Sequence, residues 1–428
     1  MKRKTVLLIT VMFCLFSACN SSKQDNSDMD KIAEKYVKLV LNVGSHDPVF
    51  VDAYYGPEEW KPDSIELSLD EIIQTAIKLK NELASIDVSG REKIIRERKH
   101  FLTKQLIAVE TYTELLQGKK KTFDEQSEKL YDAVSPPCSE QFADSILTEL
   151  DKLLPGDGDL YSRYNSLVNE FIIPENKVSE VFDAAINECR RRTKEHINLP
   201  ENENFTTEYV TDKVWGAYNW YKGNSYSLIQ INTDLPKKIL DAVGLASHEG
   251  YPGHHVYNSL LETKLYHDKG WVEYSVYALF SPQSLIAEGS ANYGVEIIFP
   301  GNERHKFEKE VLFPLSDLDT TNADLYFKAS EIAGKLTYVR NDIARDLMDG
   351  KISEEQAVDK MVKLLSTRER AEKSLGFIKA NGSYVITYNI GQDLIRNYIN
   401  RLAGKDDQKK ADVFFDLLSR PLTGSDLL

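Results

Sequence analysis

Apolar residues recur at steps of three and four along much of the chain. In the clearest run, Ile72, Ala76, Leu79, Leu83 and Ile86 follow one another at these steps, which places them on one face of an amphipathic helix. A second run at 102–116 repeats the pattern. The same periodicity predicts further helices at about 176–195, 236–250, 284–298, 322–348, 354–372 and 389–403. We therefore expect a mainly α fold.

One segment departs from the helical period. Tyr226–Asn232 (YSLIQIN) is short and has the composition of a strand. No Pro/Ser-rich linker divides the chain, and no internal repeat is present. We therefore predict one large helical body with a small β element. Its two lobes are expected at 30–165 and 166–428.

The first residues have the pattern of a secretory signal. The cations Lys2, Arg3 and Lys4 precede a short apolar run that ends at Ala18, and Cys19 follows. Ser17-Ala18-Cys19 resembles a bacterial lipobox, which predicts a signal peptide at 1–18, a lipid on Cys19 and a polar tether at 19–29. A plain secretory signal with an incidental cysteine is the alternative. Both place the protein in the cell envelope or beyond, and the lipidated form would be membrane-anchored.

The composition is that of a soluble globular protein, and its charge excludes one class of partner. Hydrophobic residues make up 42% and charged residues 28%, and the formal net charge is −14. A phosphate backbone would repel such a chain, and no basic stripe offsets the charge. The short basic run at 190–194 (RRRTK) is interpreted as a solvated helix face. We expect no nucleic-acid partner.

Candidate chemistry is concentrated at 248–255, where the sequence HEGYPGHH holds three of the eight histidines. In the zinc-peptidase pattern His-Glu-x-x-His, two histidines four residues apart share a metal and the Glu is the general base. Here Pro252 takes the place of the second His. On a regular helix His254 would be about 240° out of phase with His248, and His255 about 10.5 Å further along the axis. A metal site therefore requires Pro252 and the flanking glycines to turn the chain back.

A third ligand candidate lies on the helix expected at 284–298. Glu288 and Asn292 share one face of this helix, so Glu288 could bind a metal while Asn292 supports a ligand. Two His and one Glu, with water in the fourth place, form the ligand set of catalytic zinc sites that hydrolyse peptides. Small residues at 287, 289–291 and 294 would let another helix approach closely. Pairing of Glu288 within a helical bundle is the alternative interpretation.

With these motifs in place, the chain resembles the bacterial family designated domain of unknown function eight-eight-five. The resemblance rests on HEGYPGHH at 248–255, EGSANYGVE at 288–296 and TYNIGQDLIRNY at 387–398. Weaker matches extend it over about 52–400, and they include DAYYGPEEW at 52–60 and SLIQINTDLP at 227–236. Two positions depart from the family pattern, Ser290 in place of the usual Trp and Asn292 in place of Leu.

The resemblance implies a zinc-metallopeptidase-like fold and a peptide substrate. It implies that His248, His254 and Glu288 bind one Zn²⁺ and that Glu249 activates the water. His255 is the alternative second ligand, or a donor to the transition state. Tyr388 and Arg396 resemble residues that hold the substrate or its developing oxyanion. The strand at 226–232 would lie at the cleft edge and pair with an extended peptide.

Two functions remain open at this point. The first is an envelope-anchored zinc-dependent metallohydrolase, a peptidase acting on short peptides, with Glu249 as general base. The second is a lipoprotein that binds metal or another ligand without catalysis. Glu249 discriminates between them, because a site that only holds metal has no need of a Glu beside its first ligand.

Overall fold

The protein is described from a computed structural model, which covers residues 27–213 and 215–428. The predicted signal peptide, the lipidated Cys19 and most of the tether lie outside these residues. A helix spans 27–46, so the last three residues of the predicted tether at 19–29 are already helical. Within the described residues, no helix combines the length and apolar character needed to cross a membrane.

The fold is mainly α, as the periodicity predicts. The helices that follow the one at 27–46 are α2 (Leu69–Ala84), α3 (Lys93–Leu116), α4 (Phe123–Tyr131), α5 (Glu140–Leu153), α6 (Leu160–Asn169), α7 (Val178–His196), α8 (Ile239–Leu245), α9 (His254–Leu260), α10 (Pro282–Ile298), α11 (Glu303–Phe307), α12 (Phe313–Leu315), α13 (Ala323–Gly334), α14 (Thr337–Met348), α15 (Glu354–Lys363), α16 (Arg368–Asn381), α17 (Ile386–Ala403) and α18 (Asp407–Leu417). The strands are β1 (Val51–Tyr54), β2 (Asn204–Val210), β3 (Ala217–Tyr221), β4 (Tyr226–Asn232) and β5 (Val276–Ala278).

Helix α2 shows how the local sequence specifies an element. Ser68 and Glu71 form a reciprocal capping box at its start, which satisfies two backbone donors. The predicted stripe from Ile72 to Leu83 is buried along the helix. Two longer predictions are wrong in one respect, because each expected helix is a pair. The stretch 322–348 divides after Gly334, and 354–372 divides at 364–367, where Leu365 has a φ of 65° and Thr367 caps α16.

The predicted strand at 226–232 is confirmed, but its place in the sheet is not at an edge. β4 lies between β2, which runs parallel to it, and β3, which runs antiparallel. Both edges of β4 are therefore already paired, and the prediction that this strand would take an extended peptide is wrong. The edge strands of this sheet are β2 and β3, and of the two it is β3 that lines the cavity described below. A second small sheet pairs β1 with β5.

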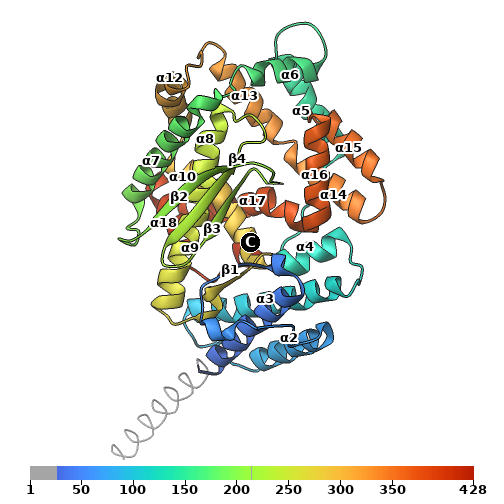
Figure 1. Ribbon diagram of the computed structural model, residues 1–428, viewed down its shortest axis with the longest axis vertical. Helices are drawn as coiled ribbons and strands as arrows, with labels where there is room; N and C mark the ends of the chain where they lie inside the picture. Colours follow the sequence, from blue (N-terminus) through green and yellow to red (C-terminus); the bar gives the residue numbers. More distant parts are fainter. Residues whose placement is uncertain (1–26, 214) are drawn as a thin grey trace, which may run out of the picture.

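The elements are arranged around one continuous core (Figure 1). Helices α2, α3 and α4 gather at one end of the molecule, whereas α5 and α6 pack with α13 at the other. The segment expected to form an N-terminal lobe at 30–165 therefore contributes helices to both ends. The three-stranded sheet and α14–α16 lie on opposite sides of the middle (Figure 1).

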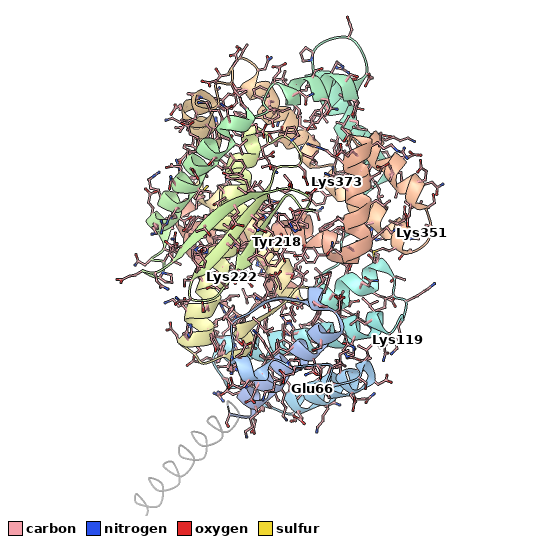
Figure 2. All side chains as sticks on the ribbon, viewed as in Figure 1. Glu66, Lys119, Tyr218, Lys222, Lys351 and Lys373 are labelled. Atoms are coloured by element: carbon pink, nitrogen blue, oxygen red, sulfur yellow. The ribbon has the colours of Figure 1, made fainter. Side chains whose placement is uncertain are left out.

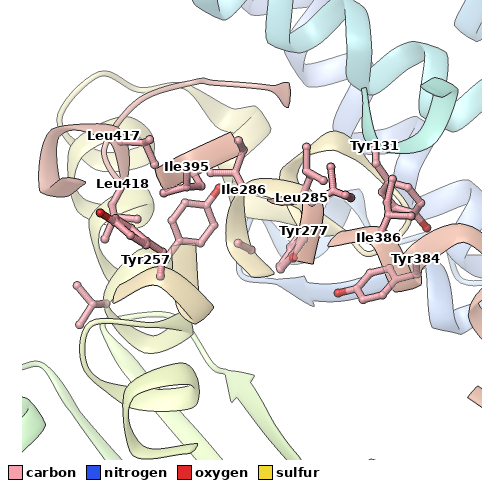
Figure 3. Packing of buried hydrophobic residues seen from close by; sticks show 14 of the residues in the cluster. Tyr131, Tyr257, Tyr277, Leu285, Ile286, Tyr384, Ile386, Ile395, Leu417 and Leu418 are labelled. Carbon is pink, nitrogen blue, oxygen red and sulfur yellow. The ribbon is translucent and has the colours of Figure 1, made fainter. Parts of the chain in front are cut away.

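Helices α10 and α17 cross at the centre of this core. A Cβ on Gly289 would lie only 2.4 Å from the backbone carbon of Gly391, so the two helices touch through their glycines. This confirms that the small residues of 287–294 admit a second helix. Leu285 and Ile286 of α10 pack there among buried aromatic and aliphatic side chains (Figure 3). The crossing fixes the position of Glu288, which directly precedes Gly289 on α10.

Candidate metal centre

A tight reversal of the chain brings two histidines of the HEGYPGHH motif together. Helix α8 continues into a π-helical turn at Ala246–Gly250, and α9 begins at His254. The N–H of Gly253 donates to the carbonyl of Ser247 at 2.9 Å. A Cβ on Gly253 would lie 1.8 Å from the carbonyl oxygen of His248, so only glycine fits this position. The expected turn at Pro252 and Gly253 is confirmed.

Three side chains converge where the chain turns back. His248 Nε2 lies 3.1 Å from His254 Nε2 and 3.2 Å from Glu288 Oε2, and His254 Nε2 lies 3.7 Å from the same oxygen. Glu288 is 6% exposed, and no group of the described residues donates a hydrogen bond to its Oε2. A buried carboxylate oxygen that faces two imidazole nitrogens without a donor is arranged for a cation. His248, His254 and Glu288 can therefore hold a metal ion.

Neighbouring groups orient these three side chains. Asn292 Nδ2 donates to the carbonyl of Tyr388 at 2.9 Å, which turns Asn292 Oδ1 towards His248 Nδ1, also at 2.9 Å. His248 therefore donates from Nδ1 and presents Nε2 to the site. Tyr384 donates to Glu288 Oε1 at 2.7 Å and leaves Oε2 free to point at the histidines. The supporting role expected for Asn292 thus has a definite geometry, at the position where the sequence departs from the family pattern.

The charges of the site reinforce one another. Burial would lower the pKa of His248, but the adjacent carboxylates of Glu288 and Glu249 raise it to about 9. Burial would raise the pKa of Glu288, but the neighbouring His254 and His248 hold the pKa of its carboxyl far below the usual range. The centre therefore favours an anionic carboxylate and positive charge on its nitrogen side.

Glu249 lies beside the three convergent residues, and its carboxylate makes no hydrogen bond or ion pair with the described residues. Its side chain lines the same cavity, although the residue is only 6% exposed. Burial raises the pKa of the Glu249 carboxyl. Asn219 Nδ2 fixes the backbone here by donating to the Glu249 carbonyl at 2.6 Å. A carboxylate held this way can accept a proton more readily than one in water.

The centre opens into a cavity of about 560 Å³ between β1 and β3 on one side and α16 on the other. Aromatic side chains form much of its wall, and Tyr218 of β3 marks its position in the middle of the molecule (Figure 2). A second cavity of about 650 Å³ shares Phe377 and Tyr388 with it and is lined by Arg304 and Arg340. Tyr388, predicted as a site residue, is thus brought to the centre, with its ring centroid 6.4 Å from that of His248.

Two other predicted residues are not brought to the centre. Arg396 lies outside the lining of the cavity and forms ion pairs with Glu296 and Asp393 at 2.6 and 2.7 Å. His255 is fully buried on the other face of α9, where its Nδ1 lies 2.9 Å from Ser227 Oγ. The structure therefore distinguishes the two candidate ligands, because only His254 joins His248 and Glu288.

His255 belongs to a buried polar cluster behind the centre. Glu203 is its anionic member, 3% exposed, and accepts from Tyr251 at 2.6 Å and from Arg190 at 2.7 Å. Lys194 lies 2.9 Å from the same carboxylate. Arg190 and Lys194 thus neutralise a buried acid while 37% and 46% of their side chains stay exposed. The interpretation of 190–194 as a solvated face is wrong for Arg192, whose side chain is 17% exposed and paired with Glu188. This cluster anchors the turn from behind through Tyr251 and His255.

The main cavity residues that sequence reasoning missed are Asp52, Tyr218 and Tyr384. Tyr218 donates a short hydrogen bond to Asp52, and both side chains line the cavity. No spacing rule joins two residues 166 positions apart, although the weak family match at 52–60 begins at Asp52. Tyr384 lies just before the motif at 387–398 but is not part of it. The motif therefore pointed to this region of the chain without marking Tyr384 itself.

Comparisons with known proteins add little to this geometry. No family model matches the chain, and no curated protein matches it. One solved structure, described as "BsuCP Crystal Structure", aligns over 94% of this chain and 90% of its own length with 11% identity and a TM-score of 0.41. A likeness this weak supports no statement about fold or function. The resemblance to the family eight-eight-five therefore remains a resemblance carried by the motifs.

Proposed function

We propose that the protein is a zinc-dependent hydrolase that cleaves peptide bonds in the cell envelope. The observation that carries the proposal is the convergence of His248, His254 and Glu288 beside the unpaired carboxylate of Glu249. Two histidines and one glutamate are the donors of catalytic zinc sites in peptidases. A structural zinc site usually closes the coordination with four protein ligands, whereas three leave a place for reaction.

The donor atoms fit zinc in spacing as well as in kind. Ligands about 2.0–2.1 Å from a tetrahedral zinc ion lie roughly 3.3 Å from one another. The three separations here are 3.1, 3.2 and 3.7 Å. The free Oε2 of Glu288 and the outward Nε2 of His248 supply the lone pairs that such an ion needs. Other divalent ions accept similar ligands, so the identity of the metal is part of the proposal.

The residues of the chain divide the work of hydrolysis. Zinc in this site would act as a Lewis acid on the scissile carbonyl and on the attacking water. Glu249 accepts the proton of that water, because its buried carboxylate has a raised pKa and no hydrogen-bond partner among the described residues. It then returns the proton to the leaving amine. Asn292 and Tyr384 hold His248 and Glu288 in place while this happens.

Tyr388 is suited to stabilise the developing oxyanion. Its side chain lines the cavity next to His248, and its hydroxyl makes no hydrogen bond with any described residue. Burial raises the pKa of this phenol well above its usual value, so it stays protonated and able to donate. Arg396, which is held by two carboxylates away from the cavity, has no part in the proposed mechanism.

A peptide is favoured as substrate by the free edge of β3. Ala217, Tyr218, Asn219 and Trp220 of this strand line the cavity, and only β4 pairs with it among the described strands. An extended peptide could add to this edge through main-chain hydrogen bonds, as in β-augmentation. The role first expected of the strand at 226–232 thus passes to its neighbour. The lipid on Cys19 would tether this activity to a membrane.

Metal content and hydrolysis together test the proposal. The purified protein should carry about one zinc per chain by elemental analysis. It should cleave members of a short-peptide library, and Glu249→Gln should retain zinc and fold but lose hydrolysis. Glu288→Ala should bind zinc much more weakly. If Glu249→Gln cleaves peptides as fast as the parent, the mechanism is wrong. A zinc-loaded protein that cleaves no peptide would instead favour the non-catalytic binding lipoprotein.

A further inference from the structure

The cavity at the metal centre has an unbalanced negative charge. Among the described residues, its lining includes three carboxylates, Asp52, Glu249 and Glu288, and no lysine or arginine. If the zinc of the proposed function is present with two neutral histidines, its two positive charges leave one carboxylate without a counter-charge. Glu249, buried and unpaired, is needed as a base, and Glu288 as a ligand. The carboxylate left over is that of Asp52.

The backbone aims Asp52 into the cavity. Val51 pairs with Ala278 and Ala53 with Tyr277, so two steps along β1 match one step along β5 and Asp52 is the extra residue of a bulge. Such bulges redirect a side chain from the regular alternation of a strand. Tyr218 donates its hydroxyl to Asp52, and no lysine or arginine is paired with this carboxylate among the described residues. Burial raises the pKa of Asp52 to about 6, although the hydrogen bond from Tyr218 opposes this.

The walls around Asp52 also suit a cation. Trp215, Tyr218, Trp220 and Tyr388 all line the cavity, and the faces of aromatic rings attract positive charge. Trp220 already shows this preference, because the ammonium of Lys222 lies 5.4 Å from its ring centre. Lys222 is itself exposed and outside the cavity lining (Figure 2).

The adjoining cavity is less negative than the one at the metal. Its lining on the far side of Tyr388 and Phe377 holds Arg304 and Arg340 against one carboxylate, Glu296, and Arg304 is paired with Glu308 at 2.8 Å. Arg340 has no carboxylate partner among the described residues, and Arg370 is the charge that acts on it most strongly. A substrate that spans Tyr388 would therefore meet its most negative surroundings at the metal and, beyond it, a cavity with Arg340, a cation unpaired among the described residues. A positively charged group is directed to the metal side.

We infer that Asp52 binds an ammonium or guanidinium group of the substrate, held between the aromatic walls of the metal cavity. The inference rests on the proposed function for the zinc charge and for the peptide nature of the substrate. Two groups of a peptide have this chemistry, the free amino terminus and a basic side chain. Asp52 would thus select cationic peptides and fix which end or side chain faces the metal.

Binding of small probes tests the site without any need for turnover. Isothermal titration calorimetry of the zinc-supplemented full chain would compare phenylalanine amide with N-acetylphenylalanine amide. A second pair would compare N-acetyl-lysine amide with N-acetyl-norleucine amide. A hydrogen bond to a charged group contributes about 1.5–3 kcal/mol, so one cationic probe should bind roughly 10–150-fold more tightly than its neutral partner. The first pair reports an amino-terminal site and the second a side-chain site.

Asp52→Asn should abolish that preference, because the amide still accepts from Tyr218 but carries no charge. Its zinc content and unfolding midpoint should match those of the parent. Glu208→Gln is the matched control, since this acid of β2 lies outside the cavity lining and its carboxylate accepts a hydrogen bond from Gln230 alone among the described residues. It should leave the preference intact. Equal affinity for charged and neutral probes on the parent would overturn the inference, as would an equal loss of both on Asp52→Asn, or no binding of either cationic probe.

The outcomes separate this inference from the proposed hydrolase. If the parent discriminates between the probes but cleaves no peptide, the cation site stands and the hydrolase proposal fails. If the parent cleaves acetylated and free peptides at the same rate and shows no preference among the probes, the hydrolase stands and the cation site fails.

Discussion

Replacement of Gly253 by alanine tests the turn on which the metal centre depends. The added Cβ would lie 1.8 Å from the carbonyl oxygen of His248 and 2.4 Å from that of Ser247. Real Cβ atoms keep at least 3.0 Å from such neighbours, so His248 and residue 253 must separate by at least 1.2 Å. Both obstacles are backbone atoms, and no side-chain rotation can relieve the contact.

The separation is larger than a metal site tolerates. Ligands must be held within about 0.5 Å of their productive geometry, and residue 253 directly precedes the ligand His254. We expect zinc affinity to fall by more than the roughly 10–100-fold that accompanies loss of an outer hydrogen-bond partner. The overpacked turn should also lower the free energy of unfolding by about 1–3 kcal/mol.

Competition with a chromophoric chelator would measure zinc affinity, and urea unfolding with excess chelator would measure stability free of metal. Gly376→Ala is the matched control, because Gly376 lies within α16 and a Cβ there meets nothing within 4 Å. That variant should keep zinc and gain about 0.5–1 kcal/mol from reduced backbone freedom in the unfolded chain. If Gly253→Ala binds zinc like the parent, the tight return of the chain is not what assembles the ligands.

Three further outcomes are expected. Asn292→Ala should lower zinc affinity about 10–100-fold by the same chelator assay, since His248 loses the acceptor that orients it, and an unchanged affinity would refute that role. Burial would raise the pKa of Glu203, but its hydrogen bonds outweigh burial and hold this pKa below the usual range, so its stabilisation is present above about pH 4.3 and is lost as the pH falls. Glu203→Gln should therefore cost about 1–3 kcal/mol at neutral pH, because buried Tyr251 and His255 lose a charged acceptor while Arg190 and Lys194 remain partly exposed to water. It should also flatten the acid loss of stability in urea titrations, and an acid limb as steep as that of the parent would contradict this. Burial raises the thiol pKa of Cys138 to about 11 and of Cys189 to about 12, so iodoacetamide near pH 8 should modify Cys138 first and the fully buried Cys189 only on unfolding, as mass spectrometry would show.

The helices were predictable because their signal is local. The spacing of Ile72, Ala76, Leu79 and Leu83 is set by the helical repeat itself, and each of these residues is buried in α2. Breaks inside longer stretches were not predictable in the same way. At Leu365 the chain takes a positive φ without a glycine to announce it.

The residues of the candidate metal centre were predictable from the motifs, but the choice between the two adjacent histidines was not. His248, Glu249, His254 and Glu288 are marked by residue type and neighbourhood, and the glycine that closes the turn was visible in the sequence. The choice between His254 and His255 depends on which face of α9 meets Glu288, which only the packing of α10 decides.

Long-range partners carried no such signal. Asp52 meets Tyr218 because a bulge in β1 turns it towards another sheet, and neither the bulge nor the approach of the sheets is written in either segment. Likewise, Arg190 and Lys194 belong to a basic run of the kind found on protein surfaces. Both nevertheless form ion pairs with the buried Glu203, which is positioned by the loop after α7. The sequence predicted the strand at 226–232. Its central position in the sheet depends on which strands pair with it, and its own residues do not encode this.

The chain runs from α2–α4 at one end to α5 and α6 at the other before it builds the sheet. A cut near residue 165 would therefore free no self-sufficient piece, because it would strip cover from two distant regions at once. The chain therefore offers no domain boundary near residue 165 at which it could be truncated or its halves exchanged. We expect the candidate metal centre and the rest of the fold to unfold together, in a single calorimetric transition.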